Sequence, residues 1–351
     1  MGFFTNLSYK KKNAESAVLI DIGAESVAGA YAYYVGREAP AILCSRRIPV
    51  EVHDKEPEER AMLRALTALS EYLLREGAPI LLRLSGNGHV GDILVSINSP
   101  WQETKMRLEN FERKNPFVFT ESIVSQALKE TSFAPSGEIV ADDSIINTVL
   151  NGYETRSPYG KSTRHASVTV LTSFIDKNVA GDITSLVRSI YSAENVLLIA
   201  GNSLRYQAIK KAFPHEHNAL ILSVSEQTIS ISLVQKNLLV ALHEATNDGS
   251  NNDSNNWTTL IKGELVKLTR EHSLPRTIFL LANESMVFPI KKVFDEANFN
   301  SFWLSGNQPK IVPVLASHLI GLVRQTTSSP PDLPLLLMAL YHHPHPITFA
   351  S

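Results

Sequence analysis

Residues 18 to 27 read VLIDIGAESV, where an aspartate interrupts an apolar run that has the pattern of a strand. Asp21 needs a partner, because a buried carboxylate without one costs folding free energy. Gly23 lets a backbone approach a bulky group closely, and Ser26 adds a hydroxyl donor near the turn. Such a turn can hold phosphate through backbone N–H groups while Asp21 holds hydrated Mg²⁺. The short pattern also fits an ordinary strand that ends in a capped turn, so both interpretations stay open.

Composition excludes several classes of protein. The chain has 351 residues, 44% hydrophobic and 19% charged, with a net charge of −2, which indicates a globular protein with more than one core. No charge excess suggests a nucleic-acid partner, and no apolar run approaches the ~18 residues of a membrane span. Cys44 is the single cysteine, so we expect no internal disulfide, no CxxC metal site and a reducing, cytoplasmic compartment.

The first residues, MGFFTNLSYKKKN, place apolar side chains ahead of three lysines. This order is the reverse of a signal peptide, so we expect no export. Two interpretations stay open, a frayed terminus and a weak contact with an anionic membrane surface. At most, the segment predicts peripheral membrane contact.

Hydrophobic periodicity predicts an alternation of strands and helices. Strands are expected at 28–36, 39–50, 92–101, 164–174, 195–201 and 277–282, at the start of 145–163, and as paired strands over 218–245. Helices are expected at 56–77, 119–133, 175–192, 204–213, 257–272, 284–297, 311–324 and 332–341. Residues 102–115 are charged and polar and receive no element, and the Asn-rich stretch 245–256 predicts a surface loop. The fold class is mixed α/β, with residues 99–172 as a small α+β insertion between two sheet halves.

The order of these pieces resembles the bacterial actin-like proteins FtsA, of cell division, and PilM, of type IV pilus assembly. VLIDIGAESV resembles their first phosphate loop, and the block from residue 99 resembles their inserted SHS2-type subdomain, with NGYETRSPYGKSTRHASVTVLTS as its exit. LIAGNSLRYQAI resembles the helix entry before the second sheet, and PDLPLLLMALYHH the closing helix. The resemblance implies duplicated ribonuclease-H-like sheets. It divides the chain into 14–98, 99–172, 173–244 and a reduced second lobe at 245–351.

Departures from the family pattern lie at the second phosphate loop. There the chain reads LSVSEQTISISLV, with Ser223 and Ser225 where the family has an acid and a glycine, and with Glu226 and Gln227 in the turn before Thr228. A glutamate repels polyphosphate, and bulk blocks close backbone approach.

A second departure lies where the family has paired glycines against the adenosine. This chain has Ala282, Asn283 and Glu284 there. By resemblance, only half of a nucleotide site is retained.

The resemblance therefore predicts a pseudo-ATPase. Asp21, Gly23, Ala24 and Ser26 are the remnant of the first phosphate loop, and Ser223, Ser225 and Thr228 form a degenerate second one. We expect no resident metal site, and either no cofactor or weakly bound Mg-ATP.

The predicted function is an FtsA-like scaffold in cell division that acts by protein–protein contacts, with possible self-association. Two alternatives stay open, a PilM-like component of type IV pilus assembly and a nucleotide-dependent polymerising ATPase. FtsA proteins usually end in a basic amphipathic helix, whereas this sequence ends in ITFAS, which weakens the expectation of direct membrane anchoring.

Three further motifs have simpler explanations. PYGKST lacks the first glycine of a P-loop, and GNGHVGD precedes a strand rather than a helix, so both predict turns. YHHPHP places His342, His343 and His345 close together, but no cysteine or second histidine group completes a metal site.

Overall fold

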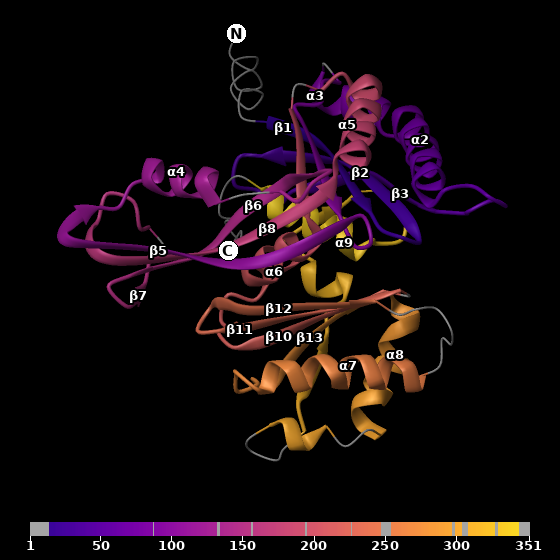
Figure 1. Ribbon diagram of the computed structural model, residues 1–351. Coiled ribbons are helices and arrows are strands. Elements are labelled where there is room, and N and C mark those ends of the chain that lie inside the picture. The colour runs from indigo at the N-terminus through magenta and orange to yellow at the C-terminus, as the bar shows by residue number, and fades with distance from the viewer. Residues whose placement is uncertain are drawn as a thin grey trace, which may run out of the picture.

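The computed structural model describes residues 14–86, 88–131, 134–155, 157–193, 195–225, 227–246, 254–296, 299–303, 308–326 and 329–343 (Figure 1). A six-stranded sheet forms the first part, in the order β15-β3-β2-β1-β4-β9. Its central strand β1 pairs antiparallel with β2 and parallel with β4. The strands are β1 (Ala14–Ile22), β2 (Ser26–Val35), β3 (Ala41–Pro49), β4 (Asp92–Ile97), β9 (Asn195–Ala200) and β15 (Arg324–Gln325).

A second sheet repeats this plan in the order β12-β11-β10-β13-β14. Its central strand β10 again pairs antiparallel with the next strand, β11, and parallel with β13. The strands are β10 (Ala219–Val224), β11 (Thr228–Gln235), β12 (Leu238–Thr246), β13 (Thr277–Ala282) and β14 (Lys310–Pro313). The same five-strand order therefore occurs twice, which confirms a mixed α/β fold with duplicated sheets.

A third, smaller sheet has the order β5-β8-β6-β7 and extends to one side of the first sheet (Figure 1). It consists of β5 (Gln102–Val118), β6 (Glu138–Leu150), β7 (Tyr153–Glu154) and β8 (Ser162–Asp176), covered by helix α4 (Glu121–Thr131). The sequence assigned no element to 102–115, and the structure places that stretch within the 17-residue strand β5. β5 is an edge strand that is exposed over most of its length, so its residues are polar and lack the apolar alternation by which a strand is predicted.

Helices form three layers around the two large sheets. One layer covers the outer face of the first sheet, and another covers the outer face of the second (Figure 1). The first contains α2 (Glu58–Glu76), α3 (Ala78–Ser85) and α5 (Lys177–Tyr191); the second contains α7 (Ser254–Thr269) and α8 (Glu284–Glu296), with the short η2 (Asn300–Phe302) nearby. Between the sheets lie α6 (Gly201–Ala212) and α9 (Leu333–His342), in a core shared by both.

One predicted helix is wrong. Residues 311–324 form strand β14, the short 3₁₀ helix η3 (Ala316–Leu319) and a turn that leads into β15. Pro313 is incompatible with a helix interior, and the apolar residues before it pair with β13 in parallel register. Gly321, at φ +91°, then turns the chain toward β3.

The turns expected from the two glycine motifs are present. Gly160 has φ +83° and Gly86 has φ +82°, a backbone region that favours glycine, and β8 begins directly after PYGK. Of the Asn-rich stretch, residues 247–253 lie outside the described residues, and α7 begins at Ser254. Within the described ranges, no helix combines the length and the apolar character needed to cross a membrane.

Candidate functional site

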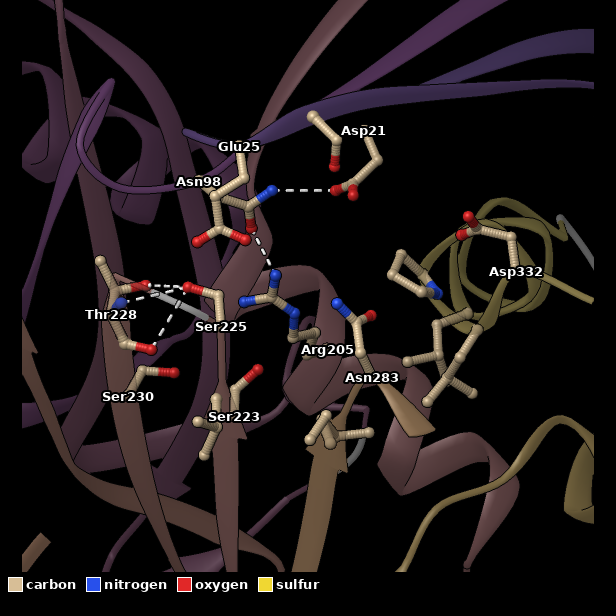
Figure 2. Close-up of a pocket in the computed structure, with 18 of the residues that line it drawn as sticks. Asp21, Glu25, Asn98, Arg205, Ser223, Ser225, Thr228, Ser230, Asn283 and Asp332 are labelled. Carbon is tan, nitrogen blue, oxygen red and sulfur yellow. Dashed lines mark hydrogen bonds between the residues drawn. The ribbon is translucent and has the colours of Figure 1, made fainter. Parts of the chain in front are cut away.

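A cavity of about 410 Å³ lies between the two large sheets (Figure 2). We call it the cleft. It is lined by the β1–β2 turn, the end of β4, helix α6, the β10–β11 turn and the start of α9. The seven residues predicted as remnants of the two phosphate loops line this cavity: Asp21, Gly23, Ala24, Ser26, Ser223, Ser225 and Thr228.

Asp21 has its partners within the chain. It is 5% exposed, its Oδ1 accepts a hydrogen bond from Asn98 Nδ2 at 2.9 Å, and its Oδ2 lies 3.4 Å from Arg47 Nη2. Arg47 also donates to both carboxylate oxygens of Asp332, at 2.7 and 3.0 Å, and to Ser26 Oγ at 2.8 Å. Burial lowers the pKa of Arg47, but the hydrogen bond and charge of Asp332, with the charge of Asp21, outweigh it and raise that pKa. The guanidinium is therefore a permanent cation beside Asp21.

The first turn is closed by its own hydrogen bonds. Gly23 N donates to Ser26 O at 3.0 Å, and Trp101 Nε1 donates to Gly23 O at 2.9 Å. The N–H group of Gly23 is thus directed within the hairpin rather than toward the cavity.

Glu25 joins the two turns across the cleft. Its Oε1 accepts a hydrogen bond from the backbone N–H of Gln227 at 3.0 Å, across 202 positions of sequence. In the second turn, Ser225 N donates to Thr228 O, and the two side-chain hydroxyls lie 2.9 Å apart. Glu226 lies outside the described residues. The backbone N–H of Gln227, in the second turn, therefore already donates to a carboxylate of the chain.

A polar network continues from Asp21 to the second sheet. Arg205 on α6 donates to Asn98 Oδ1 at 2.5 Å and to Asn202 Oδ1 at 3.4 Å. Asn202 accepts from Ser230 Oγ and donates to Glu244 Oε1 at 2.5 Å. Burial lowers the pKa of Arg205 and raises the pKa of Glu244, because each charge is partly removed from water.

Gly201 makes this network possible. A Cβ atom built there would collide with Asn98 Oδ1, so only glycine lets α6 begin this close to the end of β4. The close approach brings Arg205 within reach of Asn98.

The sequence did not identify Glu25, Arg47, Asn98 and Arg205 as residues of the site. Two signals were available. Asn98 lies within the predicted strand 92–101 as Asp21 interrupts another, and Arg47 ends the stretch AILCSRR. Arg205 gave no signal, because one arginine on a predicted helix is ordinary.

The C-terminal histidines lie away from the cleft. His342 Nε2 lies 3.4 Å from Asp92 Oδ2, and His343 Nε2 is hydrogen-bonded to Glu38 O at 2.8 Å. Both rings make edge contacts with Tyr34. His345 lies outside the described residues, and the part of the chain that is described contains no group of three metal-ligating side chains.

Comparison with known proteins gives a fold and no family. No protein-family profile and no curated protein matches the sequence. A chain of the PilM–PilN type IV pilus biogenesis complex matches over 93% of this chain and 97% of its own, with 13% identity and a TM-score of 0.55. The fold is actin-like. At this identity the likeness shows the fold alone.

Two further solved structures superpose less closely. A Bacteroides thetaiotaomicron protein with an actin-like ATPase fold and unknown function matches over 96% of this chain and 99% of its own, with 11% identity and a TM-score of 0.49. The cytoplasmic domain of EpsL, an inner membrane component of the Vibrio cholerae type II secretion system, covers 93% and 94%, with 8% identity and a TM-score of 0.38.

Proposed function

We propose that this chain is an actin-fold scaffold that acts by binding other proteins and does not turn over ATP. One observation carries the proposal. The groups with which two phosphate loops would hold Mg-ATP already have partners within the chain. Arg47 forms an ion pair with Asp21, and Glu25 accepts a hydrogen bond from the N–H of Gln227. A hydrated Mg²⁺ at Asp21 would lie beside a guanidinium, and a phosphate at Gln227 would meet a carboxylate. These residues do not fit Mg-ATP.

The comparisons favour the pilus-assembly alternative over the cell-division interpretation. The similar chain belongs to a complex of PilM with PilN, and it covers nearly the whole of this chain. We therefore propose a PilM-like role, in which the chain binds a protein component of an assembly machine at the inner face of a membrane. Self-association is a second proposed mode of contact, and nucleic acid is not a proposed partner.

Calorimetric titration with ATP and Mg²⁺, together with a phosphate-release assay, tests the proposal directly. We expect no saturable heat up to millimolar nucleotide and no phosphate release above that of buffer. Saturable Mg-ATP binding that Asp21→Asn abolishes would overturn the proposal in favour of a nucleotide-dependent polymer.

Partner binding provides the positive test. Candidate assembly proteins from the source organism are captured with the wild-type chain and with Asp21→Asn, each with and without Mg-ATP. We expect equal recovery in all four conditions, with circular dichroism as the control for folding. Recovery that requires nucleotide or an intact Asp21 would contradict a scaffold of this kind.

A further inference from the structure

Arg205 differs from the other cleft arginine in its partners. Arg47 contacts two carboxylates, those of Asp21 and Asp332. The acceptors of Arg205 are the neutral amide oxygens of Asn98 and Asn202, and among the described residues no carboxylate lies within 4 Å of its guanidinium. Arg205 therefore carries a positive charge into the cleft, and no carboxylate of the described chain is in direct contact with it.

The guanidinium also has unused hydrogen-bonding capacity. An arginine has five N–H donors in a planar fork, a geometry that matches carboxylate and phosphate. Asn98 receives one donor from Nη2 and Asn202 one from Nη1. Within the described residues, the Nε–H and one N–H on each terminal nitrogen have no acceptor. Burial lowers the pKa of this side chain and outweighs the opposing charges of Asp21 and Glu244, so these carboxylates do not fully compensate its charge.

The surrounding cavity contains polar side chains and lies beside both large sheets. Ser223, Ser225 and Ser230 come from the second sheet and its first turn, and Figure 2 shows them with Asn283 around Arg205. Hydroxyl and amide groups of this kind orient a small ligand through hydrogen bonds, and about 410 Å³ is within the range of small-molecule sites.

Charge limits what such a ligand can be. Among the described residues, five carboxylates line the cleft, those of Asp21, Glu25, Glu244, Glu284 and Asp332, against two guanidiniums. Since Arg47 is already paired, a triphosphate would face an excess of negative charge. A single oxyanion needs only one cation, and Arg205 provides it.

We propose that the cleft binds a small ligand that carries one oxyanion, a phosphomonoester or a carboxylate, held on Arg205 without Mg²⁺. This inference rests on the proposed function, in which the cleft does not bind Mg-ATP. The ligand would contact α6 together with the second sheet, and so would stabilise the junction between the two halves of the molecule.

Thermal-shift titrations at constant ionic strength test the site. The probes are inorganic phosphate and glycerol 3-phosphate for the phosphate source, acetate and glycolate for the carboxylate source, and ATP with Mg²⁺. The proteins are wild type, Arg205→Gln, Arg205→Lys and the control Arg75→Gln, which removes a guanidinium whose side chain is 70% exposed.

We expect at least one single-oxyanion probe to raise the melting temperature saturably in wild type and in Arg75→Gln. Affinity should fall at least about tenfold in Arg205→Gln and less in Arg205→Lys, because lysine keeps the charge but loses the fork. Equal affinity in wild type and Arg205→Gln, or no saturable shift in wild type, would overturn the inference. If Arg205→Gln does not fold, the comparison of Arg205→Lys with wild type tests the inference. Equal affinity of these two proteins for the oxyanion would contradict a contact through the planar fork of the guanidinium.

The two proposals can fail separately. No shift with any probe would overturn the oxyanion site and leave the ATP-independent scaffold intact. Mg-ATP that binds more tightly than phosphate would overturn both. Phosphate or carboxylate binding without any effect of Mg²⁺ would support both.

Discussion

At the scale of single residues, Arg47 is the cation that pairs with both Asp21 and Asp332. Replacing it by glutamine leaves two carboxylates close together in a partly buried position, since the side chains of Asp21 and Asp332 are 7% and 15% exposed. We expect Arg47→Gln to lower the free energy of unfolding by about 1–3 kcal/mol, because Arg47 is itself one-third exposed and water screens part of the loss. Urea denaturation measures it. Arg75→Gln, at a surface ion pair, should cost clearly less, and equal losses would show that Arg47 is not structural.

Glu244 makes the cleft sensitive to pH. Burial raises the pKa of its carboxyl above the ordinary 4.5, so between the unfolded and folded pKa values the folded state binds more protons. The stability contribution is then complete below pH 4.5 and is lost as pH rises through the folded pKa.

We therefore expect Glu244→Gln, which can still accept from Asn202, to gain stability relative to wild type as pH rises from 4 to 7. Urea denaturation over a pH series measures the difference between the two proteins. A difference that stays constant with pH would contradict the role assigned to burial.

The sequence predicted that Asp21 needs a partner but not which one. A carboxylate within an apolar strand needs a partner, and the neighbouring residues alone are enough to show this need. The groups that meet it, Arg47 and Asn98, are 26 and 77 positions away in the chain and come together only through strand pairing. Residues that satisfy such a demand across a sheet leave little trace in a single sequence.

At the scale of elements, the junction between β4 and α6 depends on Gly201. We expect Gly201→Ala to lower the melting temperature and to weaken oxyanion binding at Arg205, because the new methyl group would displace Asn98. Differential scanning calorimetry measures the first effect. The matched control is Gly263→Ala in α7, where a Cβ meets nothing within 4 Å and alanine favours the helix. Similar losses in the two variants would exclude a specific clash.

Element prediction succeeded where one face of an element is buried and the opposite face is wet. Helix α2 follows this pattern, and its periodic leucines lie in the core. Strand β5 has less contrast, since its more covered face, at Arg107, Glu109 and Phe111, is only half-buried and is largely charged. In 311–324 the apolar residues belong to a parallel strand and to a 3₁₀ turn, and Ile320 is exposed, so the helical spacing there was coincidental.

At the scale of the whole molecule, α9 packs into the core shared by the two large sheets. Met338 is 1% exposed in that core. We expect Met338→Ala to cost about 2–5 kcal/mol and to destabilise both halves together. Tryptophan fluorescence during urea denaturation can report this, since Trp101 lies by the first turn while Trp257 and Trp303 lie in the second half. Ile320→Ala, at a side chain 79% exposed, should change little. Separate transitions for the two halves in Met338→Ala would contradict a shared core.

The order of elements along the chain also bears on synthesis. Strand β15 pairs with β3, and α9 fills the core beneath β1 and β2, although both come from the last residues described. A nascent chain on the ribosome therefore presents an unfinished first sheet, with an open edge at β3 and uncovered apolar side chains, until β15 and α9 have emerged. For a protein of this design, the first sheet can be completed only after β15 and α9, which come about 280 positions later than β3, have been translated.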